Sequence, residues 1–160
     1  MACVYIVVGK IASGKTTWAC EFDEEKSIVL SHDELMLYLS DDCEGRAAHV
    51  DRANRISKYF ASVCKDLVKL DISPILDYGF WTRGERDLLK EELTKYGIPY
   101  KLMYIKCEEN KRIERLEKRN QSLSSSLQRE YIIPPTLRER LDSFFEEPNE
   151  DEGAIVVISE

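Results

Sequence analysis

The chain has 160 residues, which suits one domain with a single hydrophobic core. It is 43% hydrophobic and 33% charged, with 7 glycines and 5 prolines, and this composition excludes a wholly disordered, collagen-like or low-complexity protein. Because the net charge is -7, a nucleic-acid partner would need a locally basic groove, and no long nucleic acid is expected.

Strands and helices are predicted to alternate along the chain. Short apolar runs predict strands, and apolar residues recurring at intervals of three and four predict helices. The expected strands cover residues 3–8, 27–30, 74–76, 100–105 and 154–158. The expected helices cover residues 13–22, 33–39, 46–70, 85–95 and 109–119, with another opened by the capping-box pattern Thr136-x-x-Glu139. This order predicts a single α/β domain over 1–160, with a parallel sheet covered by helices on both faces.

Residues 9–16, Gly-Lys-Ile-Ala-Ser-Gly-Lys-Thr, match the phosphate-binding pattern G-x-x-x-x-G-K-[ST]. The motif follows a predicted buried strand and opens a predicted helix, as the pattern requires. Backbone N–H groups of such a loop bind phosphate oxygens, Lys15 reaches the β- and γ-phosphates, and the Thr16 hydroxyl binds Mg²⁺. The sequence therefore predicts ATP and Mg²⁺ as ligands, with a nucleotide site formed by Gly9, Ala12, Ser13, Gly14, Lys15, Thr16 and Thr17.

Two carboxylates follow the second and third predicted strands. Ligands of such sheets bind beyond the carboxyl ends of the strands, where Asp33 and Asp77 are expected. Phosphoryl transfer to an alcohol needs one carboxylate for the acceptor hydroxyl and oxygen atoms for the metal ion. We assign Asp33 to the hydroxyl and Asp77 to the metal, although either one could be the base.

The arginines near these carboxylates provide further candidates. Arg112, Arg115 and Arg119 are spaced by three and four, so they share one helix face that leads into a Ser-rich segment. This pattern predicts a lid over about residues 112–133, with Arg115 and Arg119 neutralising charge on the transferring phosphate. A solvated helix face is the alternative, because glutamates are interleaved. Arg83 and Arg86 are weaker candidates for substrate contacts.

The sequence resembles the small P-loop kinases, a group that includes the kinase domain of polynucleotide kinase, chloramphenicol phosphotransferase and the zeta-toxin-like sugar-nucleotide kinases. The resemblance rests on the loop at 9–16, Ser31-His32-Asp33, and Leu76-Asp77 with Arg86 following. It also rests on residues 115–120, Arg-Leu-Glu-Lys-Arg-Asn, and on residues 145–148, Phe-Glu-Glu-Pro. It implies a five-stranded sheet in the order 2-3-1-4-5, ATP as donor, Asp33 as general base and Arg119 as a lid residue near the nucleotide. Met36 stands where polynucleotide kinases of the group place an arginine for the acceptor strand.

The expected function is transfer of the γ-phosphoryl group of ATP to a hydroxyl of a small molecule or nucleotide-like metabolite. Two alternatives stay open: a 5'-hydroxyl polynucleotide kinase, and a regulatory or toxin-related nucleotide-binding module with slow turnover. A protein partner is unknown. The apolar run Val4–Val8 is far shorter than the ~20 residues of a membrane-spanning helix, so no membrane is expected. The cytoplasm is the expected compartment, because the chain starts without a signal-peptide pattern and its five cysteines are widely spaced.

Overall fold

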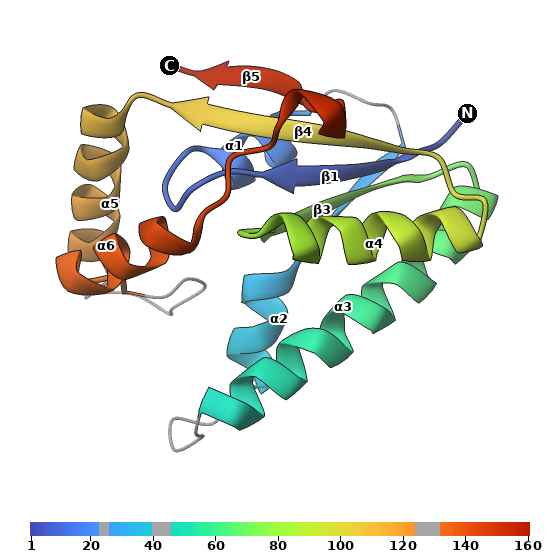
Figure 1. Cartoon of the computed structure of the whole chain (residues 1–160), viewed down its shortest axis with the longest axis horizontal. Coiled ribbons are helices and arrows are strands. Elements are labelled where there is room, and N and C mark those ends of the chain that lie inside the picture. The colour runs from blue at the N-terminus through green and yellow to red at the C-terminus, as the bar shows by residue number, and fades with distance from the viewer. Residues whose placement is uncertain (23–25, 40–45, 124–131) are drawn as a thin grey trace.

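A parallel sheet of five strands forms the middle layer of the computed structural model, which describes residues 1–22, 26–39, 46–123 and 132–160 (Figure 1). All neighbouring strands run parallel, in the order β2-β3-β1-β4-β5. This confirms the predicted fold class and strand order. The strands are β1 (Val4–Val8), β2 (Ser27–Ser31), β3 (Ser73–Gly79), β4 (Tyr100–Cys107) and β5 (Ile155–Ser159).

Helices cover both faces of the sheet. They are α1 (Lys15–Glu21), α2 (His32–Leu39), α3 (Arg46–Lys69), α4 (Arg83–Lys95), α5 (Glu109–Leu123) and α6 (Pro135–Phe144), with a short 3-10 helix η1 (Glu150–Glu152) before β5. The helices α2, α3 and α4 share one face with one half of the core, whereas α1 packs on the other. Figure 1 shows α5 and α6 together beside the end of the sheet toward which the strand arrows point.

Strand β1 divides the core because all five of its residues are buried. Val4, Ile6 and Val8 face the α3 and α4 side, and Tyr5 and Val7 face α1. Alternate side chains of a strand point to opposite faces, and a strand buried on both faces is apolar throughout. The continuous apolar run in the sequence is explained by this central position.

Most predicted boundaries shift by one to three residues in the structure, and the shifts in α4, α5 and α6 are informative. Helix α5 continues to Leu123, beyond the predicted end at residue 119, so the start of the Ser-rich segment is helical. Helix α6 begins at Pro135 with Pro134 as N-cap, so Thr136 caps nothing. Helix α4 begins at Arg83 rather than at Glu85, because Thr82 and Glu85 form a reciprocal capping box that the sequence analysis missed.

Strand register brings the candidate site together. Asp77 of β3 is paired with Val7 of β1 on one side and with Ser31 of β2 on the other. The phosphate-binding loop follows β1 directly, and Asp33 lies two residues after Ser31. The loop and both carboxylates therefore meet at the carboxyl edge of the sheet, as expected. None of the described helices is long and apolar enough to cross a membrane.

Candidate active site

The loop over residues 9–16 wraps tightly, and two of its glycines are needed for this shape. Gly14, the N-cap of α1, has φ of 99°, in the left-handed region that other residues rarely adopt. At Gly9 a Cβ atom would lie 2.5 Å from Ser13 Oγ and 2.6 Å from the Ile105 carbonyl oxygen. Only glycine fits this position without displacing the backbone of β4.

The polar groups of the loop suit a bound phosphate. Lys15 Nζ donates to the loop's own carbonyl oxygens, 3.0 Å from Gly9 O and 2.9 Å from Lys10 O. Ser13 is 2% exposed, and its Oγ is a buried polar atom without a hydrogen-bond partner among the described residues. A buried hydroxyl without a partner costs stability, so the loop is built for a ligand that supplies one. These residues fit the phosphates of a nucleotide.

A hydrogen bond joins the loop helix to β3. Thr16 Oγ1 donates to Asp77 Oδ2 at 2.6 Å. Asp77 is 6% exposed, and burial raises the pKa of its carboxyl, against the opposing effects of the Thr16 hydrogen bond and the Lys15 charge. A hydroxyl and a carboxylate side by side are oxygen ligands of the kind that Mg²⁺ prefers. Thr16 and Asp77 therefore fit a hard divalent cation next to the phosphates.

Asp33 differs from Asp77 in its surroundings. Its side chain is 71% exposed at the first turn of α2. Both carboxylates are close enough to Lys15 to affect its pKa. Burial lowers the pKa of Lys15, and the negative charges of Asp77 and Asp33 oppose that change. Asp33 therefore lies near the loop with its oxygens open to solvent, where an incoming hydroxyl could reach them. Thr17, in the first turn of α1, is exposed as well.

The side chains of the three arginines of α5 lie at different places. Arg112 is 1% exposed and donates to the carbonyl oxygen of Ile11 at 3.1 Å, to Asp142 of α6 and to Glu109. The first turn of α5 is thus fixed to the phosphate-binding loop and to α6. A lid that starts at 112 would have to break these bonds when it moves, and the lid itself stays a prediction.

Arg115 and Arg119 also lie in different surroundings. Arg115 Nη1 is 2.8 Å from Ser159 Oγ at the end of β5 and 3.5 Å from where a Cβ of Gly14 would lie. Arg115 thus joins the ends of β4 and β5, where it also donates to Cys107 Sγ at 3.4 Å. Arg119 is close enough to Lys15 for its charge to lower the pKa of that ammonium, after the larger effect of burial. Of the pair, only Arg119 affects the pKa of Lys15, and its contact with phosphate stays a prediction.

Asn120, next to Arg119, closes the base of the segment that follows. Its Nδ2 donates to the Ile133 carbonyl at 2.7 Å, and its Oδ1 accepts from the Ile133 N–H at 3.1 Å. Residues 124–131 of the predicted lid lie outside the described residues. The sequence analysis missed this paired contact, and only the Asn beside Arg119 could have signalled it.

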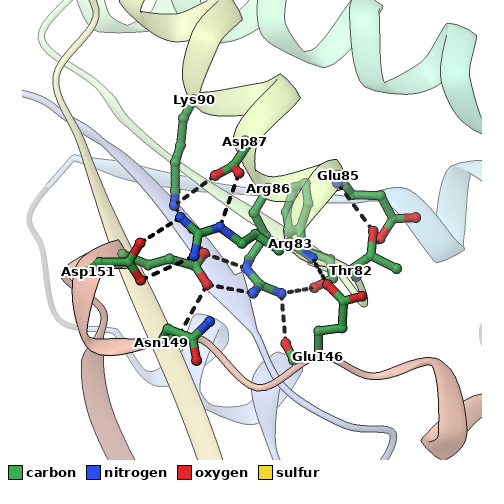
Figure 2. A network of polar contacts seen from close by, with 11 residues as sticks. Thr82, Arg83, Glu85, Arg86, Asp87, Lys90, Glu146, Asn149 and Asp151 are labelled. Atoms are coloured by element: carbon green, nitrogen blue, oxygen red, sulfur yellow. Dashed lines mark hydrogen bonds and ion pairs between the residues drawn. The ribbon is translucent and has the colours of Figure 1, made fainter.

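Arg83 and Arg86 lie in a different network, which joins the start of α4 to η1 (Figure 2). Arg86 is fully buried and forms a bidentate ion pair with Glu152, with both N–O distances 2.7 Å. Its remaining guanidinium nitrogen, Nη1, donates to the carbonyl oxygens of Phe80 and Glu146. Arg83 pairs with Asp151 at 2.6 Å. These contacts occupy the donors, so we withdraw both arginines as substrate residues.

A family model described as "AAA domain" matches residues 4–132, so the chain belongs to this family. No curated protein sequence matches the chain significantly. Among solved structures, Chaetomium thermophilum Kti12 in complex with ADP-AlF3 has a TM-score of 0.72 at 18% identity, covering 97% of this chain and 88% of that one. A sugar kinase from Janibacter sp. HTCC2649 has a TM-score of 0.65 at 17% identity, covering 99% and 86%.

A chain of the Pnkp1/Rnl/Hen1 RNA repair complex also has a TM-score of 0.65, at 21% identity. It covers 89% of this chain and 43% of that one. Together with the family match, these likenesses confirm the resemblance to small P-loop kinases and a fold that binds nucleotides. At such low identities they describe the fold, and the acceptor has to be argued from the site.

Proposed function

We propose that this protein is an ATP-dependent phosphotransferase whose acceptor is a hydroxyl group of a small molecule. The proposal rests on one arrangement above all: the Thr16–Asp77 hydrogen bond of 2.6 Å near the charge of Lys15, with the exposed carboxylate of Asp33 in the first turn of α2. The buried carboxylate is suited to a metal ion and the exposed one to a substrate. Two carboxylates in such different surroundings support two different roles.

Each side chain has a defined part in this proposal. Lys15 releases its contacts to the loop carbonyls and binds phosphate oxygens, while Thr16 and Asp77 hold Mg²⁺. The metal ion, when bound, offsets negative charge on the phosphates. Asp33 accepts the hydrogen bond of the acceptor hydroxyl, orients it and takes its proton. Arg119 stabilises charge that develops on the transferring group.

Labelled ATP offers a direct test on a panel of hydroxylated metabolites. Asp33→Asn should lower transfer by ~100-fold or more, the usual scale for losing a positioned base. ATP should still raise its melting temperature, because ligand that binds only the folded state stabilises it by mass action. Lys15→Ala should lose that thermal shift. Glu34→Gln, which removes a charge from the neighbouring residue of α2, is the matched control and should transfer phosphate normally.

Two results would contradict the proposal. If Asp33→Asn transfers phosphate at the normal rate, the base is elsewhere, and Asp77→Asn would be examined next. If ATP binds through Lys15 but no acceptor becomes labelled, the regulatory or toxin-related module becomes the better description. The likeness to the RNA repair complex makes 5'-hydroxyl oligonucleotides a necessary member of the panel.

Our proposal disfavours such an oligonucleotide as the natural acceptor. Met36 is 1% exposed inside the core, so the position expected to bind a strand phosphate offers no charge, and the whole chain carries -7. We expect residual oligonucleotide binding to be weak and to fall steeply with added salt. Tight binding that persists at high salt would instead favour the polynucleotide kinase.

A further inference from the structure

The imidazole ring of His32 is held rigidly beside Asp33, at the start of α2. His32 is 5% exposed, and its ring stacks on Tyr78 with a centroid distance of 4.0 Å and an angle of 10° between the planes. On its far side, Nε2 lies 3.2 Å from the carbonyl oxygen of Ala53 in α3. The ring is therefore clamped between β3 and α3 and cannot turn without losing these contacts.

The hydrogen bonds around the ring decide where its hydrogen lies. Ala53 O can only accept, so Nε2 must carry the hydrogen that it donates. The same carbonyl oxygen accepts from Ser57 Oγ at 2.9 Å. Because the Ser57 hydrogen is used in that bond, the Tyr78 hydroxyl must donate to Ser57 Oγ. Every hydrogen in this cluster is thus assigned, and one polar atom remains, His32 Nδ1.

In the neutral ring, Nδ1 has a lone pair and no hydrogen. Burial lowers the pKa of His32, with the Ala53 hydrogen bond and Asp33 opposing, and so favours that neutral form. Nδ1 lies 4.0 Å from Asp33 Oδ1, and within the described part of the chain no group donates a hydrogen bond to it. An ionised carboxylate is also only an acceptor. Two acceptors therefore lie side by side, and neither can satisfy the other.

We propose that His32 Nδ1 is a second substrate-binding acceptor, and that the site selects molecules with an O–H or N–H donor on the carbon adjacent to the one that bears the reacting hydroxyl. The reacting hydroxyl has a single hydrogen, which it donates to Asp33, so the donor for Nδ1 must come from a neighbouring group. Vicinal diols and 2-amino alcohols have this pattern. The 5'-hydroxyl of a nucleic acid does not. This inference rests on the proposed phosphotransferase function and names its substrate class.

Matched pairs of acceptors test the proposal by kinetics. The pairs are glycerol with 1,3-propanediol, 1,2-propanediol with 1-propanol, and ethanolamine with ethanol. The wild-type protein should prefer the first member in kcat/KM by roughly 2- to 10-fold, the scale of one net hydrogen bond. His32→Gln keeps a donor for Ala53 O but removes the acceptor near Asp33, and should lose this preference. His32→Asn places an amide oxygen near the position of Nδ1 and should recover part of it.

A spectroscopic measurement does not depend on turnover. The chain has two histidines, so protein labelled with ¹⁵N-histidine gives two ring systems, and His49→Gln identifies the resonances of His32. Glycerol or ethanolamine, added with ADP and Mg²⁺, should shift the unprotonated Nδ1 resonance while the hydrogen stays on Nε2. The matched partner molecules, 1,3-propanediol and ethanol, should not.

The outcomes separate the two proposals. Equal kcat/KM within the pairs, or a preference that persists in His32→Gln, overturns the role of His32 while the phosphotransferase stands. If no acceptor is phosphorylated, the proposed function has failed. The Nδ1 resonance then still decides whether the cluster binds diols and amino alcohols, and an unchanged resonance overturns that as well.

Discussion

The buried pair of Arg86 and Glu152 allows a quantitative prediction. Glu152→Gln keeps the shape of the side chain but removes the negative charge between Arg86 and Lys90, whose Nζ lies 3.1 Å from Glu152 Oε2. The hydrogen bond with Arg86 is the main cause that lowers the pKa of Glu152 from 4.5 to about 2, with Lys90 helping and burial opposing. That difference corresponds to roughly 3 kcal/mol of stability. Breaking one side of a buried pair costs a similar ~3–5 kcal/mol.

Thermal unfolding measures this cost. A loss of ~3 kcal/mol should lower Tm by about 6–12 °C in a protein of this size. Glu150→Gln is the control, because Glu150 is exposed in the same 3-10 helix and loses the same charge. Its Tm should stay within about 2 °C of the wild type, because exposed substitutions usually cost less than ~0.5 kcal/mol.

The pH dependence has a definite sign. The carboxyl of Glu152 has a lower pKa in the folded state, so its stabilising effect is complete above about pH 4.5 and is lost as the pH falls toward 2. The difference in unfolding free energy between wild type and Glu152→Gln should therefore be constant near neutrality and shrink below pH 4.5. A variant that melts like the wild type would refute the reasoning. Normal melting with weakened substrate binding would return Arg86 to the substrate site.

Two further predictions concern the phosphate side of the site. Arg119→Ala should lower turnover by ~100-fold or more while ATP affinity, measured by calorimetry, changes only a few fold, because the contact strengthens in the transition state; Lys118→Ala is the exposed control. Equal losses in both quantities would assign Arg119 to ground-state binding. Gly14→Ala should abolish the ATP-dependent rise in Tm, because φ of 99° disfavours a side chain and its Cβ would lie 2.7 Å from Ser159 Oγ. A normal rise would show that the loop can adapt.

The sequence by itself determined the central part of this protein. The apolar run of β1, the loop pattern at 9–16 and the alternation of strands and helices predicted the sheet and the tight loop between β1 and α1. These predictions succeeded because they depend on local order: periodicity sets the element type, and a glycine pattern sets the shape of a loop. Asp33 and Asp77 were found because strand ends in a parallel sheet share one edge.

Only the tertiary structure decided which charged side chains are available to ligands. Arg86 and Arg119 look alike in the sequence. In the structure, Arg86 is buried in an ion pair with Glu152, 66 residues away, whereas Arg119 lies near Lys15. In the same way, only the packing of Ala53 and Tyr78 against His32 holds its ring beside Asp33. Partners that come from distant elements leave no periodic signal along the chain. A charge can be placed on a helix face by its spacing, but what it contacts depends on the packing of the elements.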